Sequence, residues 1–106
     1  MVFLETSVFT KSIQSLLSDE EYRWLQNHLV RFPEAGDLIK GSGGLRKIRW
    51  KLEGRGKRGG VRVIYYWATS DDQLFMLFAY AKNEQGDLTK EQLLVLKKLV
   101  ETEFGK

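Results

Sequence analysis

The spacing of hydrophobic positions changes near residue 45 and divides the chain into a helical first part and a strand-rich second part. In the first part, residues 6–17 and 18–32 carry apolar side chains three and four positions apart, which is typical of helices buried along one face. A short apolar segment, residues 2–5, precedes them and is predicted to be a strand. Two amphipathic helices in succession indicate a helical hairpin.

The second helix has clear start and stop signals. Ser18 followed three residues later by Glu21 forms a capping box, and Pro33 is expected to end the helix. The apolar face of this helix is predicted to comprise Tyr22, Leu25, Leu29 and Phe32.

The second part of the chain alternates with a period of two and then returns to helical spacing. Residues 45–53, 61–69 and 74–82 predict three consecutive strands, hence an antiparallel meander. Thr89 and Gln92 form a second capping box, which opens a final helix through Phe104. We expect a single α+β domain, residues 1–106, with an antiparallel sheet, two N-terminal helices and a C-terminal helix, all packed on one face.

Composition excludes some classes of protein. The chain has no cysteine, so disulfides and thiolate metal sites are ruled out. No basic N-terminal region precedes an apolar run, and no segment approaches the length of a membrane span. We expect a cytoplasmic protein without a cofactor or metal.

The positive charge is concentrated in one segment. Residues 40–62 carry one acid, Glu53, and a net charge of +8, whereas the rest of the chain carries −5. Such a distribution favours a polyanion or an acidic partner. The basic residues of this segment are Lys40, Arg46, Lys47, Arg49, Lys51, Arg55, Lys57, Arg58 and Arg62.

Alternation along the strands predicts which of these residues cluster. Lys47 and Arg49 share one face of the first meander strand, and Arg62 lies on the polar face of the second. If the apolar faces align over the helices, these three side chains project together from the opposite face. Tyr80 and Lys82 share a face of the third strand and can join them.

Two interpretations of the cluster are open. Basic residues can guard a solvated sheet edge against aggregation, but neighbouring like charges repel across strands, so their accumulation favours an anion site. The loop "GRGKRGG" at 54–60 lacks the pattern of either nucleotide-binding motif. Its Arg55, Lys57 and Arg58 are predicted to contact a nucleic-acid backbone.

The residues for most catalytic chemistry are missing. The one histidine, His28, is expected to be structural, and no acidic or histidine set has metal-ligand spacing. Chemistry here has to use Lys, Arg, Tyr, Asn or Glu84. RNA cleavage remains feasible, because RNA supplies its own nucleophile and lysine and arginine can transfer protons and hold the phosphate.

The segments "GDLIKGSGGLRKIRWKLEGRGKRGGVRVIYY" and "FAYAKNE" resemble the RelE/HigB superfamily of type II toxins, most closely its HigB branch. The resemblance implies a small RelE-like (microbial RNase-like) fold. It also implies a ribosome-dependent endoribonuclease that cuts mRNA in the A site. A cognate antitoxin, with a helix-turn-helix DNA-binding protein as the expected type, would neutralise it.

The resemblance also implies site residues. The family's catalytic basic residues fall on Lys47, Arg49 and Arg62, with Lys82 at the end of the last strand. Asn83 stands where RelE toxins have a second basic residue, and Thr89 where they have a catalytic tyrosine. The general acid and base therefore stay open among Lys47, Glu84 and Tyr80.

Together these considerations define a predicted site with two parts. The catalytic part comprises Lys47, Arg49, Arg62, Lys82 and Glu84. The part that binds RNA and the ribosome comprises Arg46, Lys51, Arg55, Lys57, Arg58, Tyr80 and Asn83. The alternatives are a ParE-like gyrase inhibitor without enzymatic activity and an RNA-binding module without chemistry.

Overall fold

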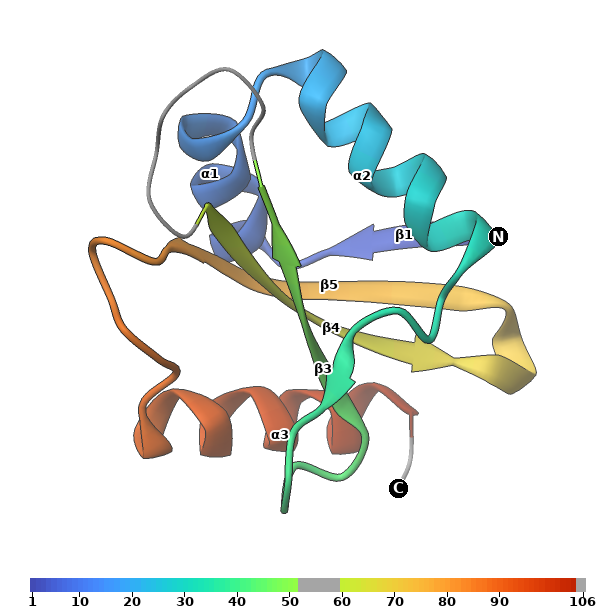
Figure 1. Ribbon diagram of the computed structural model, residues 1–106. Coiled ribbons are helices and arrows are strands. Elements are labelled where there is room, and N and C mark those ends of the chain that lie inside the picture. The colour runs from blue at the N-terminus through green and yellow to red at the C-terminus, as the bar shows by residue number, and fades with distance from the viewer. Residues whose placement is uncertain (52–59, 105–106) are drawn as a thin grey trace.

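The computed structural model describes residues 1–51 and 60–104, which form a five-stranded sheet with helices on both faces (Figure 1). The strand order is β1-β5-β4-β3-β2. The predicted loop residues Arg55, Lys57 and Arg58 lie outside the described residues.

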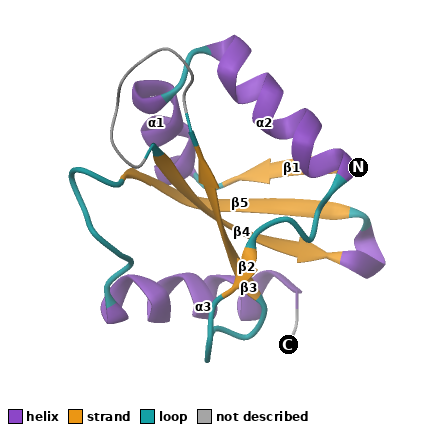
Figure 2. Cartoon of the chain, viewed as in Figure 1, coloured by secondary structure: helices purple, strands orange, loops and turns teal. Residues whose placement is uncertain are grey.

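The N-terminal elements begin and end where the sequence predicts. Strand β1 (Val2–Glu5) leads into α1 (Ser7–Leu16), which starts at Thr6, whose hydroxyl accepts a hydrogen bond from the Phe9 N–H. Helix α2 (Asp19–Arg31) follows α1 after a short connection (Figure 2). It has the predicted capping box between Ser18 and Glu21 and ends before Pro33. One detail is wrong: Phe32 is 46% exposed, because it lies beyond the last helical turn and its side chain leaves the buried face.

The second part of the chain forms the predicted antiparallel meander. Its strands are β3 (Leu45–Trp50), β4 (Val61–Ala68) and β5 (Gln73–Ala81), with the two-residue β2 (Asp37–Leu38) antiparallel to β3. A short 3-10 turn, Thr69–Asp71, joins β4 to β5. The sheet as a whole is mixed, because β1 pairs parallel to β5.

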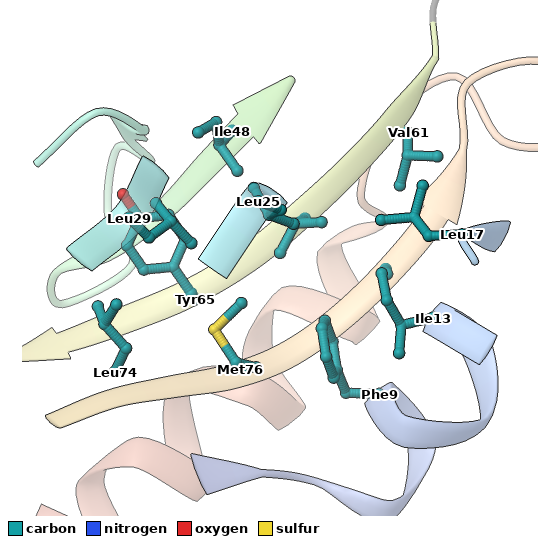
Figure 3. Close-up of a cluster of buried hydrophobic side chains, with 12 residues drawn as sticks. Phe9, Ile13, Leu17, Leu25, Leu29, Ile48, Val61, Tyr65, Leu74 and Met76 are labelled. Carbon is teal, nitrogen blue, oxygen red and sulfur yellow. The ribbon is translucent and has the colours of Figure 1, made fainter. Parts of the chain in front are cut away.

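Helices α1 and α2 cover one face of the sheet and enclose the larger core (Figure 3). Strands β3, β4 and β5 contribute to it the side chains that alternation assigns to this face. The labelled members include Phe9, Ile13, Leu25, Leu29, Ile48, Tyr65 and Met76.

The final helix, α3 (Lys90–Phe104), covers the other face of the sheet, so the prediction that all helices share one face is wrong (Figure 1). Its Leu96 and Val100 pack against a second cluster that includes Ile64. The physical reason is that β4 is apolar on both sides, and a strand buried on both faces needs cover from two layers.

Gly60 fixes how β3 and β4 meet. It lies next to β4 with a φ of +64°, and a Cβ atom there would lie 2.5 Å from the carbonyl oxygen of Trp50. Only glycine fits this close approach without strain. The two strands are thereby held in the register that places Arg49 opposite Arg62.

Candidate functional site

Arg49, Arg62 and Tyr80 form a row across three adjacent strands. Arg49 of β3 is the Cα partner of Arg62 of β4, and Arg62 is the Cα partner of Tyr80 of β5. The predicted clustering of these residues on one sheet face is therefore present. The row lies on the sheet face that points away from α1 and α2. Helix α3 covers another part of this same face, because Ile64, two residues after Arg62 in β4, packs against α3.

Burial differs sharply within this row. The Arg49 side chain is exposed, whereas Arg62 is only 6% exposed and Tyr80 5% exposed. A buried arginine keeps its charge, so Arg62 holds a permanent positive charge within the sheet. The Tyr80 hydroxyl is buried near the backbone of Leu88 and makes no well-formed hydrogen bond to another described residue.

Lys47 lies two residues before Arg49 on the same face of β3, and its ammonium group forms an ion pair with an acidic side chain. Its Nζ is 3.1 Å from Oδ1 of Asp87, in the segment between β5 and α3. The same oxygen accepts the N–H of Leu88 at 2.8 Å. The hydrogen bond from Lys47, followed by that from Leu88, lowers the pKa of Asp87 below its ordinary 3.8. Asp87 is therefore a carboxylate at neutral pH.

The segment that carries Asp87 is tied down on both sides. Lys82 donates a hydrogen bond of 2.7 Å to the carbonyl of Gly86. Gln85 donates to the carbonyl of Asp87 at 2.9 Å and to the Gln92 side chain at 2.6 Å. Gln92 belongs to the predicted capping box with Thr89, which is present. The segment is thus anchored at the first turn of α3.

The charge of Asp87 acts on Tyr80 through space. Burial is the largest cause of the raised pKa of Tyr80, and the negative charge of Asp87 adds to it, while the positive charge of Arg62 opposes it. The phenol therefore stays protonated near neutral pH and can serve as a hydrogen-bond donor.

A hollow of about 450 Å³ opens over this cationic region. Lys47 and Arg49 line one wall, and Asp87 and Leu88 line another. The remaining lining comes from β2 and its flanks and from Leu93 of α3. The hollow brings together three basic side chains, two carboxylates and several apolar side chains, which suits a ligand with anionic and apolar parts.

Other predicted residues lie apart from the row. Arg46 points to the opposite sheet face, where its guanidinium donates to the carbonyls of Glu34 at 3.1 Å and Gly36 at 2.8 Å. Lys51 is exposed at the end of β3. Two further predicted residues, Asn83 and Glu84, are exposed in the turn after β5.

Two features of the site were not found from the sequence. Asp87 is forty positions from Lys47, so no local pattern marks their contact. The rings of His28 and Trp50 lie 5.4 Å apart beside the basic strand, although they come from a helix and a strand that are far apart in the chain. No local pattern marks the second feature either, because Trp50 continues the apolar alternation of Ile48 along β3.

The described residues hold no group of three or more histidine and acidic side chains that could bind a metal ion. Among the same residues, no helix is long and apolar enough to cross a membrane.

The fold is that of small toxins from toxin–antitoxin systems. A chain of the intact E. coli RelBE toxin–antitoxin complex matches with 20% identity and a TM-score of 0.55, covering 74% of this chain and 92% of that one. E. coli RelE in the free state, with two arginines mutated to alanine, matches with 17% identity and a TM-score of 0.59. That match covers 80% of this chain and 86% of the RelE chain. At such identities the likeness concerns the fold.

The sequence itself supplies the family. The profile described as the RelE toxin of the RelE/RelB toxin–antitoxin system matches residues 34–105. This region is more than half of the chain and contains the whole cationic region together with α3. The chain belongs to the RelE toxin family.

Proposed function

We propose that this chain is a ribosome-dependent endoribonuclease that cleaves mRNA in the A site and so inhibits translation. The observation that carries the proposal is the cross-strand row of Arg49, Arg62 and Tyr80 beside Lys47. Arginine binds phosphate through two parallel hydrogen bonds, and RNA is the phosphate polymer that carries its own nucleophile. Membership of the RelE toxin family supports the same activity.

The proposed reaction needs no metal. The 2′-hydroxyl of one nucleotide attacks the adjacent phosphorus atom, and the bond from phosphorus to the 5′ oxygen of the next nucleotide breaks. The attacking hydroxyl gives up its proton, and the leaving oxygen gains one. The products are a 2′,3′-cyclic phosphate and a 5′-hydroxyl. Arg49 and Arg62 stabilise the negative charge that develops on the phosphate.

The candidates for proton transfer are Lys47, Glu84 and Tyr80. Because burial and Asp87 raise the pKa of Tyr80, its phenol suits a hydrogen-bond donor better than a base. Lys47 is already within the site and oriented by Asp87. Glu84 is exposed in the turn after β5 and would need this turn to approach the phosphate.

The proposed partners are the ribosome, mRNA and a cognate antitoxin. The E. coli RelBE complex pairs a toxin of this fold with its antitoxin, and we extend that pairing to this chain. A helix-turn-helix DNA-binding protein as the antitoxin, and placement in the HigB branch, stay predictions. Contact of Arg55, Lys57 and Arg58 with ribosomal RNA is part of the same proposal.

The proposal is tested by mapping transcripts after induction of the toxin. Primer extension should reveal cuts spaced by codons, and Arg62→Ala should abolish both the cuts and growth arrest. Arg49→Ala is a second variant, since its exposed side chain can be removed with little risk to folding. Arg23→Ala, an exposed arginine on α2, is the control and should stay toxic.

Two outcomes would contradict the proposal. Undiminished toxicity of folded Arg62→Ala and Arg49→Ala proteins would separate the row from activity. DNA damage without transcript cuts would favour the gyrase inhibitor, which has no need of a phosphate-binding row.

A further inference from the structure

A second hollow, of about 290 Å³, lies at the edge of β3 that faces α2. Its lining includes His28 of α2 together with Ile48 and Trp50 of β3. Strand β2 pairs only with Lys47 and Arg46, so the last residues of β3 have no neighbouring strand on this side within residues 1–51 and 60–104. The volume is close to the lower end of the roughly 300–1,000 Å³ range of small-ligand sites, which suits one ring system rather than a long chain.

Aromatic rings form one wall of this hollow. The ring centroids of His28 and Trp50 are 5.4 Å apart with an interplanar angle of 50°, and His28 also contacts Phe32 at 5.4 Å. Since His28 and Trp50 touch each other, a ligand ring cannot lie between them and has to stack on their free surface. Both side chains are half-buried, so part of each ring is accessible.

The cationic residues connect this hollow to the row on the sheet. Lys47 and Arg49 line the 290 Å³ hollow and also the 450 Å³ hollow. Ile48 and Trp50 face the α2 side of β3, whereas Lys47 pairs with Asp87 on the α3 side, so a phosphate held by Lys47 and Arg49 at this strand edge lies between the aromatic wall and the Asp87 segment. In a single strand of RNA, the group attached next to each phosphate is a ribose with its base.

An acidic side chain in the lining of the 290 Å³ hollow favours a base over a second phosphate as the bound group. Asp37, the Cα partner of Lys47, lines both hollows and is exposed. A carboxylate repels a phosphate, whereas it accepts hydrogen bonds from the exocyclic amino groups of bases. Aromatic stacking with an acceptor at the rim is how proteins usually hold unpaired RNA bases.

We propose that the hollow lined by His28 and Trp50 binds one unpaired nucleobase of the RNA whose phosphate lies on Lys47 and Arg49. The identity of the ligand as RNA rests on the proposed function. Nucleobase binding itself does not require that the chain cleave RNA.

The test compares two short oligonucleotides that carry the same phosphates. One is a single-stranded tetranucleotide with 2′-deoxy sugars, which cannot be cleaved through a 2′-hydroxyl, and the other has the same backbone without bases. Affinities are measured at low salt by tryptophan fluorescence and calorimetry. The natural protein should bind the tetranucleotide with bases about 5- to 150-fold more tightly than the one without bases, as expected for stacking of one base.

Substitutions then locate the base. Trp50→Leu should reduce this ratio toward one, and His28→Leu should reduce it partly. Trp24→Leu, at a tryptophan that is 54% exposed on α2 but does not line the hollow, should leave the ratio unchanged. Because Trp50 packs against the core, its replacement by leucine can also affect folding. Trp50→Phe keeps an aromatic ring and should retain most of the ratio between the affinities with and without bases.

Three results would overturn the inference: a ratio near one in the natural protein, an unchanged ratio in folded Trp50→Leu and His28→Leu, or an equal loss in Trp24→Leu. Failure of the proposed function looks different, because cleavage would then be absent while the ratio and its dependence on Trp50 persist.

Discussion

The ammonium group of Lys47 and the carboxylate of Asp87 face each other at 3.1 Å and join β3 to the segment before α3. Asp87 thus holds a carboxylate against the cation that, together with Arg49, we propose to bind the RNA phosphate beside the His28–Trp50 hollow. The pair is largely open to solvent, with the Asp87 side chain 72% exposed. Exposed ion pairs are weak, about 0.2–1 kcal/mol, so an incoming phosphate can replace the carboxylate.

Asp87→Asn should therefore tighten RNA binding. We expect an increase in affinity of about 1.4- to 5-fold at low salt, because the phosphate no longer competes with a carboxylate, and a change in the free energy of unfolding below about 1 kcal/mol. Titration with the 2′-deoxy tetranucleotide measures the first and urea denaturation the second. Asp71→Asn, an exposed acid in the turn before β5, controls for net charge. Weaker binding by Asp87→Asn alone would mean that Asp87 positions Lys47 for the phosphate.

Arg49→Gln should lower activity while slightly stabilising the fold. Arg49 and Arg62 are direct cross-strand partners, and like charges in this relation destabilise a sheet by about 0.2–1 kcal/mol. We expect the urea midpoint to rise and cleavage on ribosomes to fall on the order of 100-fold, as when one donor to a developing anion is lost. Arg23→Gln should change neither quantity. A fall in stability with Arg49→Gln would show that the two guanidinium groups are not in repulsion.

Arg46→Met should destabilise the protein rather than impair RNA binding. Its guanidinium donates to two backbone carbonyls, of Glu34 and Gly36, that precede β2. Hydrogen bonds from a charged donor contribute about 1.5–3 kcal/mol, and methionine keeps the length of the side chain without them. Urea denaturation measures the loss, with exposed Lys51→Met as the control. Loss of ribosomal cleavage at unchanged stability would instead support the RNA contact predicted from the sequence.

The protein should lose stability as the pH rises above about 10. Burial, and then the hydrogen bond and charge of Glu5, raise the pKa of Tyr22 above the ordinary 10.0. Burial also raises the pKa of Tyr65 and Tyr80. A phenol with a raised pKa stabilises the fold fully below the pKa of the unfolded chain, and this contribution is lost as the pH rises toward the folded value.

The alkaline effect is measured by urea denaturation between pH 8 and pH 11. Tyr22→Phe should reduce the slope of stability against pH, although it also removes the 2.6 Å hydrogen bond to Glu5. An identical slope in Tyr22→Phe would mean that Tyr22 does not contribute to the alkaline loss.

Local signals in the sequence predicted the three helices, the strands β1, β3, β4 and β5, and the shared sheet face of Arg49 and Arg62. The capping boxes at Ser18 and Thr89 mark the starts of α2 and α3, because each depends on residues only three positions apart. Alternation placed Arg49 and Arg62 on one face, and the register confirms it.

Contacts between distant segments could not be read from local patterns. The irregularity between Ile64 and Tyr65 shifts the pairing of β4 with β5, and no sequence period reports such a shift. The ion pair of Lys47 depends on how the segment before α3 folds back. The packing of α3 on the face away from α1 and α2 was predictable in principle, since the near-continuous apolar run of β4 is typical of a strand covered on both faces.

The parallel pairing of β1 with β5 also has a consequence for when the protein can become toxic. Residues 2–5 find their partners only at residues 73–76, and the Thr6 hydroxyl that begins α1 donates to the carbonyl of Leu77. Domains assemble during synthesis from the N-terminus, and contacts this distant in sequence form late. Strand β1 therefore cannot take its place until β5 has been synthesised, so a chain that stops before residue 73 cannot complete the sheet and the folded toxin forms only after β5 has been translated.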